Sequence, residues 1–246
     1  MKKVQSLCCV GVLLAMALPA LGQDVENTDK PGLAASVRLG TLGYGAELDY
    51  PFNSYWNARV QINSFNYDDD FNESNIEYSG ELDLSTFGAL VDFRPFEGTF
   101  KLTAGFFSNK NSISADATSA NDKVFEIGGQ RFSGSASNPL SLSANVDLGK
   151  STAGYLGLGW GNSYSTGLTF NFELGALLSG SATANLTARG TAYSVTQPQL
   201  QFDVEGNSAS AVQFRQELAK EQASLQQDLD DFEVYPVVAL GLGYRF

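Results

Sequence analysis

Charged side chains recur inside several otherwise apolar segments of this 246-residue sequence, and any chemistry is expected to be concentrated there. Paired carboxylates can act as general acid and base. A set that is balanced in sign is better explained by ion pairs in an enclosed interior of low dielectric, where unpaired charges are costly. The set has four basic and four acidic members: Arg38, Arg59, Lys101, Arg245, Glu47, Asp49, Asp92 and Glu173.

The residue types that usually carry catalysis are scarce. The sequence has no histidine, which removes the usual general base of serine chemistry and the commonest metal ligand. Its two cysteines, Cys8 and Cys9, fall in an amino-terminal segment that we expect to be cleaved, so the mature chain would have no thiol. We therefore predict no enzymatic activity, no catalytic residue, no cofactor and no metal site.

Two acidic clusters could in principle hold calcium or magnesium. Neither has the glycine-containing ligand spacing of an EF-hand loop, and solvated charge is the better interpretation. The net charge of −12 also argues against nucleic acid as a partner. The clusters are Asp68, Asp69 and Asp70, and Asp228, Asp230 and Asp231.

The elements that would position the charged residues are strands, because apolar and polar residues alternate along eight segments. Alternation alone also fits a soluble sandwich or a lipocalin-like barrel with its apolar side chains inside. The balanced charges and the alternation of short with long connections favour a membrane barrel, provided that residues 41–43 form a tight turn. The segments are 35–39, 46–52, 58–63, 87–94, 100–107, 156–161, 168–176 and 238–246.

The two ends of the sequence point to export and membrane assembly. Lys2 and Lys3 precede an apolar run at 8–18, which is typical of a secretory signal, with cleavage expected between Gly22 and Gln23. No later apolar run is long enough for a transmembrane helix. We predict a signal peptide over 1–22, a periplasmic segment over 23–32 and an eight-stranded antiparallel transmembrane β-barrel over 33–246.

Two long connections carry structure of their own. Residues 109–147 are rich in Ser, Ala and Asn, with a hairpin expected where 123–127 pairs with 130–132 across Gly128 and Gly129. They form either a binding loop or an exposed loop that tolerates change. Residues 209–232 have helical periodicity, which predicts one helix in the last long loop, either packing on its own protein or meeting a partner.

The carboxy-terminal segment 238–246 resembles the signal by which the barrel assembly machinery recognises outer-membrane proteins. That resemblance implies Tyr244 and Phe246 as its key residues. Residues 40–48 and 155–162 are similar to small Gram-negative outer-membrane barrels of the OmpA, OmpX and OmpW types. The resemblance implies a location in the cell outer membrane and contact with its lipid and lipopolysaccharide.

Three functional classes remain open. The favoured one is a structural or surface-interaction barrel, for which a monomer is compatible with the sequence. The alternative is a narrow channel or transporter for small, apolar solutes, because glycines such as Gly105, Gly157 and Gly241 would face the lumen. Those glycines could instead make room for large neighbours such as Phe107 and Leu90. The third class is a soluble periplasmic ligand carrier.

Overall fold

The computed structural model describes residues 32–73, 76–96, 98–119, 123–161 and 166–246. The predicted signal peptide and all but the last residue of the predicted periplasmic segment lie outside the described residues. The cleavage site and the first two domain boundaries therefore stay predictions.

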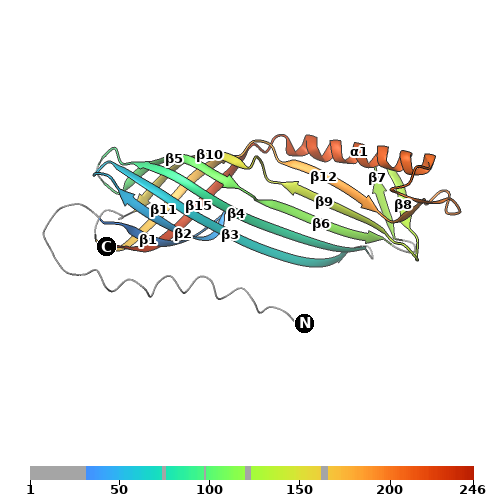
Figure 1. The fold of residues 1–246 in the computed structure, drawn as a ribbon, viewed down its shortest axis with the longest axis horizontal. Helices are drawn as coiled ribbons and strands as arrows, with labels where there is room; N and C mark the ends of the chain where they lie inside the picture. Colours follow the sequence, from blue (N-terminus) through green and yellow to red (C-terminus); the bar gives the residue numbers. More distant parts are fainter. Residues whose placement is uncertain (1–31, 74–75, 97, 120–122, 162–165) are drawn as a thin grey trace. The chain divides into compact units, whose positions relative to one another are not determined.

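Eight antiparallel strands close into a barrel, which confirms the predicted fold class (Figure 1). Each strand pairs with its neighbours in chain order, β4 with β5 and finally β15 with β1. All eight predicted segments lie in these strands except for the last residues Phe52, Arg94 and Phe246, each one position past a strand end. The strands are β1 (Ala34–Gly40), β2 (Gly43–Pro51), β3 (Trp56–Glu73), β4 (Ile76–Phe93), β5 (Phe100–Asn109), β10 (Thr152–Gly161), β11 (Gly167–Leu178) and β15 (Val234–Arg245).

The predicted alternation of short and long connections holds only in part. The links at one end of the barrel are all short, whereas two long connections and the predicted tight turn leave the opposite end. The long connection expected between the third and fourth segments is instead strand, because β3 and β4 stay paired as far as Glu73 and Ile76. β1 and β2 are joined by the two-residue turn Thr41 and Leu42, and Gly43 has a φ of 95°, which favours glycine. Phe246 N–H donates to the Leu33 carbonyl, so the described start of the chain and its carboxy-terminal end meet at the end of the barrel that carries the short links. The long connections leave from the opposite end, which we call the outer end.

The barrel has apolar side chains on its outside and charged side chains inside. The eight predicted charged residues are buried, whereas every barrel strand exposes large apolar side chains outward. This distribution is the reverse of a lipocalin-like barrel, whose apolar side chains face inward. Representative outward residues, exposed by 40–67 %, are Leu39, Leu48, Ile62, Val91, Leu102, Leu156, Phe170 and Leu242.

At the outer end, the long strands β3 and β4 continue beyond the barrel and begin a second sheet region. β6 (Ser112–Ser119) pairs with β4, β9 (Leu140–Asp147) with β6, and β12 (Thr183–Arg189) with β9. The interpretation of 109–147 as an exposed loop was therefore wrong for most of that segment. Its many Ser, Asn and Ala residues hid the strands, because β-branched and aromatic residues mark strands more clearly.

A small sheet and one helix cover one face of this outer sheet. The small sheet contains β7 (Val124–Ile127), β8 (Gln130–Gly134), β13 (Thr191–Ser194) and β14 (Gln201–Asp203), and the helix is α1 (Ala209–Leu229). The predicted hairpin and helix are both confirmed. A buried cluster that includes Phe125, Phe132, Leu140, Phe202 and Phe214 joins them into an outer domain with its own core.

Helix α1 begins at a Ser208 cap, whose hydroxyl accepts from the Ala211 N–H, and runs beside the edge strand β12. Gln226 accepts from the Ala184 N–H and donates to the Ala182 carbonyl, and Gln222 accepts from the Leu186 N–H. These side chains satisfy backbone groups that an edge strand would otherwise leave open to another chain. The helix therefore both covers the core and closes the sheet edge.

Candidate functional site

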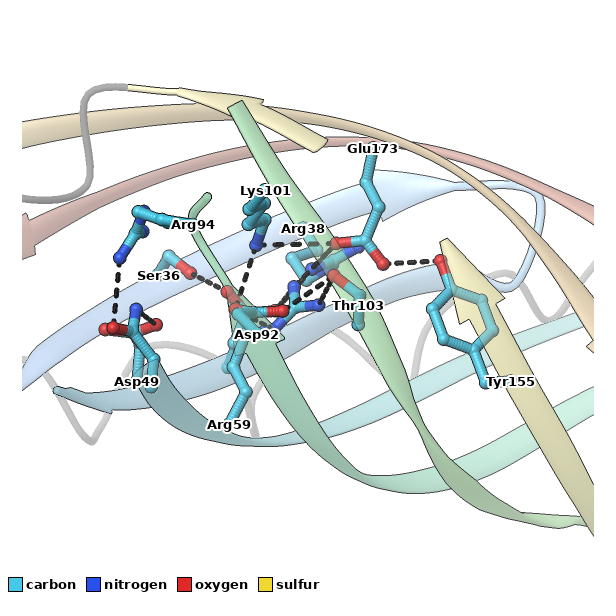
Figure 2. A network of polar contacts seen from close by, with 12 residues as sticks. Ser36, Arg38, Asp49, Arg59, Asp92, Arg94, Lys101, Thr103, Tyr155 and Glu173 are labelled. Atoms are coloured by element: carbon cyan, nitrogen blue, oxygen red, sulfur yellow. Dashed lines mark hydrogen bonds and ion pairs between the residues drawn. The ribbon is translucent and has the colours of Figure 1, made fainter. Parts of the chain in front are cut away.

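The centre of the barrel lumen holds a network of three basic and three acidic side chains (Figure 2). Arg59 is fully buried and contacts one carboxylate from each of three strands. Its Nη1 lies 2.8 Å from Glu47 Oε2 and 2.6 Å from Glu173 Oε2, and its Nε lies 3.1 Å from Asp92 Oδ2. Arg38 pairs with Glu47 and also lies 3.4 Å from Glu173.

Lys101 and two hydroxyl groups complete the central layer. Lys101 Nζ lies 3.2 Å from Asp92 and 3.7 Å from Glu173. Thr103 donates to Asp92 at 2.6 Å, and Tyr155 donates its hydroxyl to Glu173 at 2.5 Å. Three positive and three negative groups thus neutralise one another, which is the condition under which buried charges are tolerated.

The two remaining predicted charges form a separate layer nearer the end with the short links. Arg245 pairs with Asp49, and its Nη1 also donates to the Gly32 carbonyl. Asn57 donates to Asp49 at 2.8 Å and accepts from Arg94 Nη1 at 3.0 Å. The structure therefore brings six of the eight predicted residues together and places the other two in this second layer.

The predicted charge network left out several members of these layers. Arg94, Asn57, Thr103 and Tyr155 are all buried and bonded to the predicted residues. The period of two places all four on the luminal face, because each lies an even number of residues from a luminal position on its own strand or just past its end.

Beyond the charged layers, an apolar cluster fills the lumen at its outer end. Leu42, Leu90, Phe107, Tyr155 and Val237 belong to it and are at most 4 % exposed. Leu42 belongs to the β1–β2 turn, so this short connection contributes to closing the barrel rather than framing an opening. Aromatic packing supports the cluster, with the rings of Phe107 and Tyr155 5.3 Å apart.

Neighbouring side chains fill the space beside the luminal glycines. A Cβ on Gly175 would lie 2.1 Å from Tyr155 Oη, and one on Gly88 would lie 2.6 Å from the Phe107 ring. Gly159 is likewise occupied by Lys101, and Gly105 contacts Leu90. Of the two interpretations of these glycines, packing against large neighbours accounts for the geometry. A hollow of about 660 Å³ does exist, but mostly outward-facing side chains such as Leu156 and Leu174 line it, on the outer wall.

Aromatic side chains gather on the outer surface near the end with the short links. Ring pairs with centroids 4.6–6.1 Å apart are Trp56 with Phe93, Phe100 with Trp160, and Trp160 with Phe172. Tyr244 and Phe246, the residues of the expected assembly signal, are about half exposed there with their rings 5.2 Å apart. Aromatic girdles of this kind flank the apolar band of outer-membrane barrels.

The acidic clusters are separate from the lumen. Asp68, Asp69 and Asp70 are exposed on the outer part of β3, which from Phe65 onward pairs with β4 alone, and Asp68 lies opposite Glu81. Charges on an exposed edge strand discourage pairing with other chains. Over the described ranges, no group of three His, Cys, Asp or Glu side chains is arranged to hold a metal ion, and no helix is long and apolar enough to cross a membrane.

Comparisons with known proteins identify solved structures of similar fold. No protein-family model matches the chain, and no curated protein matches it. Among solved structures, the crystal structure of Acinetobacter baumannii CarO2 matches with a TM-score of 0.54 and 20 % identity, over 88 % of this chain and 99 % of that one. The crystal structure of Acinetobacter baumannii CarO matches with a TM-score of 0.53 and 19 % identity, over 87 % and 98 % respectively. The chain is thus similar to the CarO structures in fold over almost their whole length.

Proposed function

We propose that this chain is an integral barrel of the cell outer membrane, with a closed lumen that anchors an outer domain for interactions at the cell surface. The belt of exposed apolar side chains around the barrel supports membrane insertion. Soluble monomers rarely expose a continuous apolar patch larger than a few hundred Å², whereas lipid would cover this belt. The likeness to the CarO outer-membrane proteins of Acinetobacter supports the same location.

The filled lumen is the observation that carries the functional part of the proposal. An eight-stranded barrel has an interior just wide enough for side chains to fill it, and here both polar and apolar side chains do so. An ion entering the centre would have to displace groups that Arg59 and Glu173 hold through several contacts each. The geometry therefore supports a structural or surface-interaction role over a narrow channel.

The outer domain is the part available to partners. Its own apolar core and capped sheet edge would keep it folded beyond the membrane, where it would meet lipopolysaccharide and other surface molecules. A monomer suffices for this role, because the barrel closes on itself. During biogenesis the barrel assembly machinery would recognise the carboxy-terminal strand through Tyr244 and Phe246.

Two measurements on the detergent-extracted chain test the proposal. On a denaturing gel, the unboiled protein should migrate faster than the boiled protein, as a closed stable barrel does. In planar bilayers the folded protein should show no conductance above background. Recovery in the soluble fraction after carbonate washing would overturn the membrane assignment. Reproducible small conductance steps would overturn the closed lumen and favour the channel.

A further inference from the structure

A second cavity, unrelated to the lumen, lies in the outer domain between the small sheet and the start of α1. Its volume is about 180 Å³, which is room for about six water molecules at liquid density. Pockets for drug-sized ligands measure roughly 300–1,000 Å³, so this cavity suits a molecule of about one ring. The lining residues are Gln130, Phe132, Ser194, Thr196, Gln197, Leu200, Phe202, Ser210 and Gln213.

The lining contains hydroxyl and carboxamide groups but no charged side chain. Carboxamides and hydroxyls can both donate and accept hydrogen bonds. Ser194 and Thr196 share one hydrogen bond of 2.9 Å, which leaves one of their two hydroxyl hydrogens for another acceptor. Gln130 directs its Nε2 toward Glu217 at 3.5 Å, so its carbonyl oxygen is left to accept.

Most of the apolar part of the lining is packed against the domain core. Phe132 and Phe202 are buried, and each packs against Phe214 of α1, with ring centroids 5.0 Å and 6.1 Å apart. Leu200 is half exposed at the rim. The cavity therefore combines an apolar floor, packed on the domain core, with neutral hydrogen-bonding groups that come from β8, from the end of β13 and the segment that follows it, and from the start of α1.

The chemistry of this lining indicates which class of ligand the cavity can bind. Binding an ion would be unfavourable, because the ion would lose its water without meeting an opposite charge among the lining residues. Binding a purely apolar molecule would also be unfavourable, because the carboxamides and hydroxyls would be left without hydrogen-bond partners. A neutral polyol ring satisfies both requirements, because its C–H face can lie on the apolar floor while its hydroxyls bond to the rim. We propose that this cavity binds a single neutral sugar ring of the hexopyranose type.

The inference rests on the proposed function, because it makes the outer domain's surface role specific. A sugar ring could reach the cavity as a free saccharide or as a terminal unit of a surface glycan, and the two sources present the same chemistry. A one-ring ligand held by a few hydrogen bonds should bind with a Kd on the order of 1 mM.

The test uses the full chain, extracted in an amine-oxide detergent so that no detergent sugar competes, with methyl glucoside, N-acetylglucosamine and anionic N-acetylneuraminic acid as probes. Titration followed by ligand-observed NMR should show binding of at least one neutral sugar and none of the anionic sugar. Gln213→Ala and Ser194→Ala should each weaken it about three- to tenfold, the range for one lost hydrogen bond. Gln216→Ala, on the exposed part of the same helix, is the matched control and should bind as the unmodified chain does.

Absence of neutral-sugar binding, equal binding by the variants, or preference for the anionic sugar would overturn the inference. If added lipopolysaccharide displaces the bound sugar, the natural ligand is a terminal unit of a surface glycan. If the sugar binds and lipopolysaccharide does not displace it, the natural ligand is a free saccharide. Either result supports the site. Gel mobility of every variant is recorded alongside. If the unmodified chain binds no neutral sugar but still gives the fast-migrating band, the sugar site is wrong and the proposed function stands. If the chain is not retained in the membrane, the proposed function is wrong, whatever the sugar binding shows.

Discussion

Arg59 offers the sharpest test of the buried network, because it touches all three central carboxylates. In the central layer, Arg38, Arg59 and Lys101 balance Glu47, Asp92 and Glu173, three charges against three. Arg59→Met keeps much of the side-chain volume but leaves two positive charges against three negative ones. Removing one partner of a buried ion pair costs about 3–5 kcal/mol, since the remaining charge stays buried without compensation.

A second substitution separates charge balance from packing. Arg59→Met combined with Glu173→Gln leaves two charges of each sign, and the carboxamide oxygen introduced at position 173 can still accept the Tyr155 hydroxyl. If uncompensated charge causes the loss, the double variant should be more stable than the sum of the two single effects predicts, by about 2 kcal/mol. Arg189→Met, at an exposed position on β12, is the control and should change stability by less than about 0.5 kcal/mol.

The measurement is reversible urea unfolding of each variant in lipid vesicles. The protein has two tryptophans, Trp56 and Trp160, and both are partly exposed on the outer wall of the barrel. Their emission should shift when the barrel leaves the lipid, which gives the unfolding midpoint directly. A loss below about 1 kcal/mol for Arg59→Met, or strictly additive effects in the double variant, would refute the view that these charges stabilise the lumen as one coupled network.

Three further predictions follow from contacts elsewhere. Gly175→Ala should destabilise the barrel by about 1–3 kcal/mol in the same urea assay, because its Cβ would lie 2.1 Å from the Tyr155 hydroxyl oxygen; Gly154→Ala, whose Cβ would meet no atom closer than 3.8 Å, is the control, and equal losses in the two variants would contradict the clash. Gln222→Ala should speed hydrogen exchange of the Leu186 amide by about three- to tenfold, and Gln226→Ala should do the same for the Ala184 amide. Gln227→Ala, at an exposed position, is the control and should leave both exchange rates unchanged. Unaltered exchange in the first two variants would argue against edge capping. Phe246→Ala should lower the yield of membrane-assembled protein in cells, while the purified chain refolded in lipid vesicles should still give the fast-migrating band, because β1 and β15 close the barrel through their backbone pairing; normal assembly in cells would remove the proposed role of Phe246 as a signal.

Local patterns in the sequence were enough to predict the barrel strands. A strand between lipid and a polar lumen must change character at every residue, so the period of two both locates the strand and assigns each side chain to a face. Arg38, Glu47 and Glu173 were placed inside for that reason. The Gly128 and Gly129 turn and α1 were found in the same way, from signals that span only a few residues.

Other features of the molecule depend on residues that are far apart in the chain. Arg59 and Glu173 are 114 positions apart, and their contact exists only because barrel closure sets the register of every strand. The same closure decides that Tyr155 and Phe107 occupy the space beside the luminal glycines, which the sequence alone could assign either to a passage or to packing. The strands of the outer sheet were hidden because small residues such as Ala115 and Ala144 give a weak alternation, and their apolar face becomes recognisable only against the small sheet and α1. The sequence by itself thus determined which residues face inward, whereas the tertiary structure decided which of them meet, because strand register and side-chain packing are properties of the closed barrel and not of any one segment.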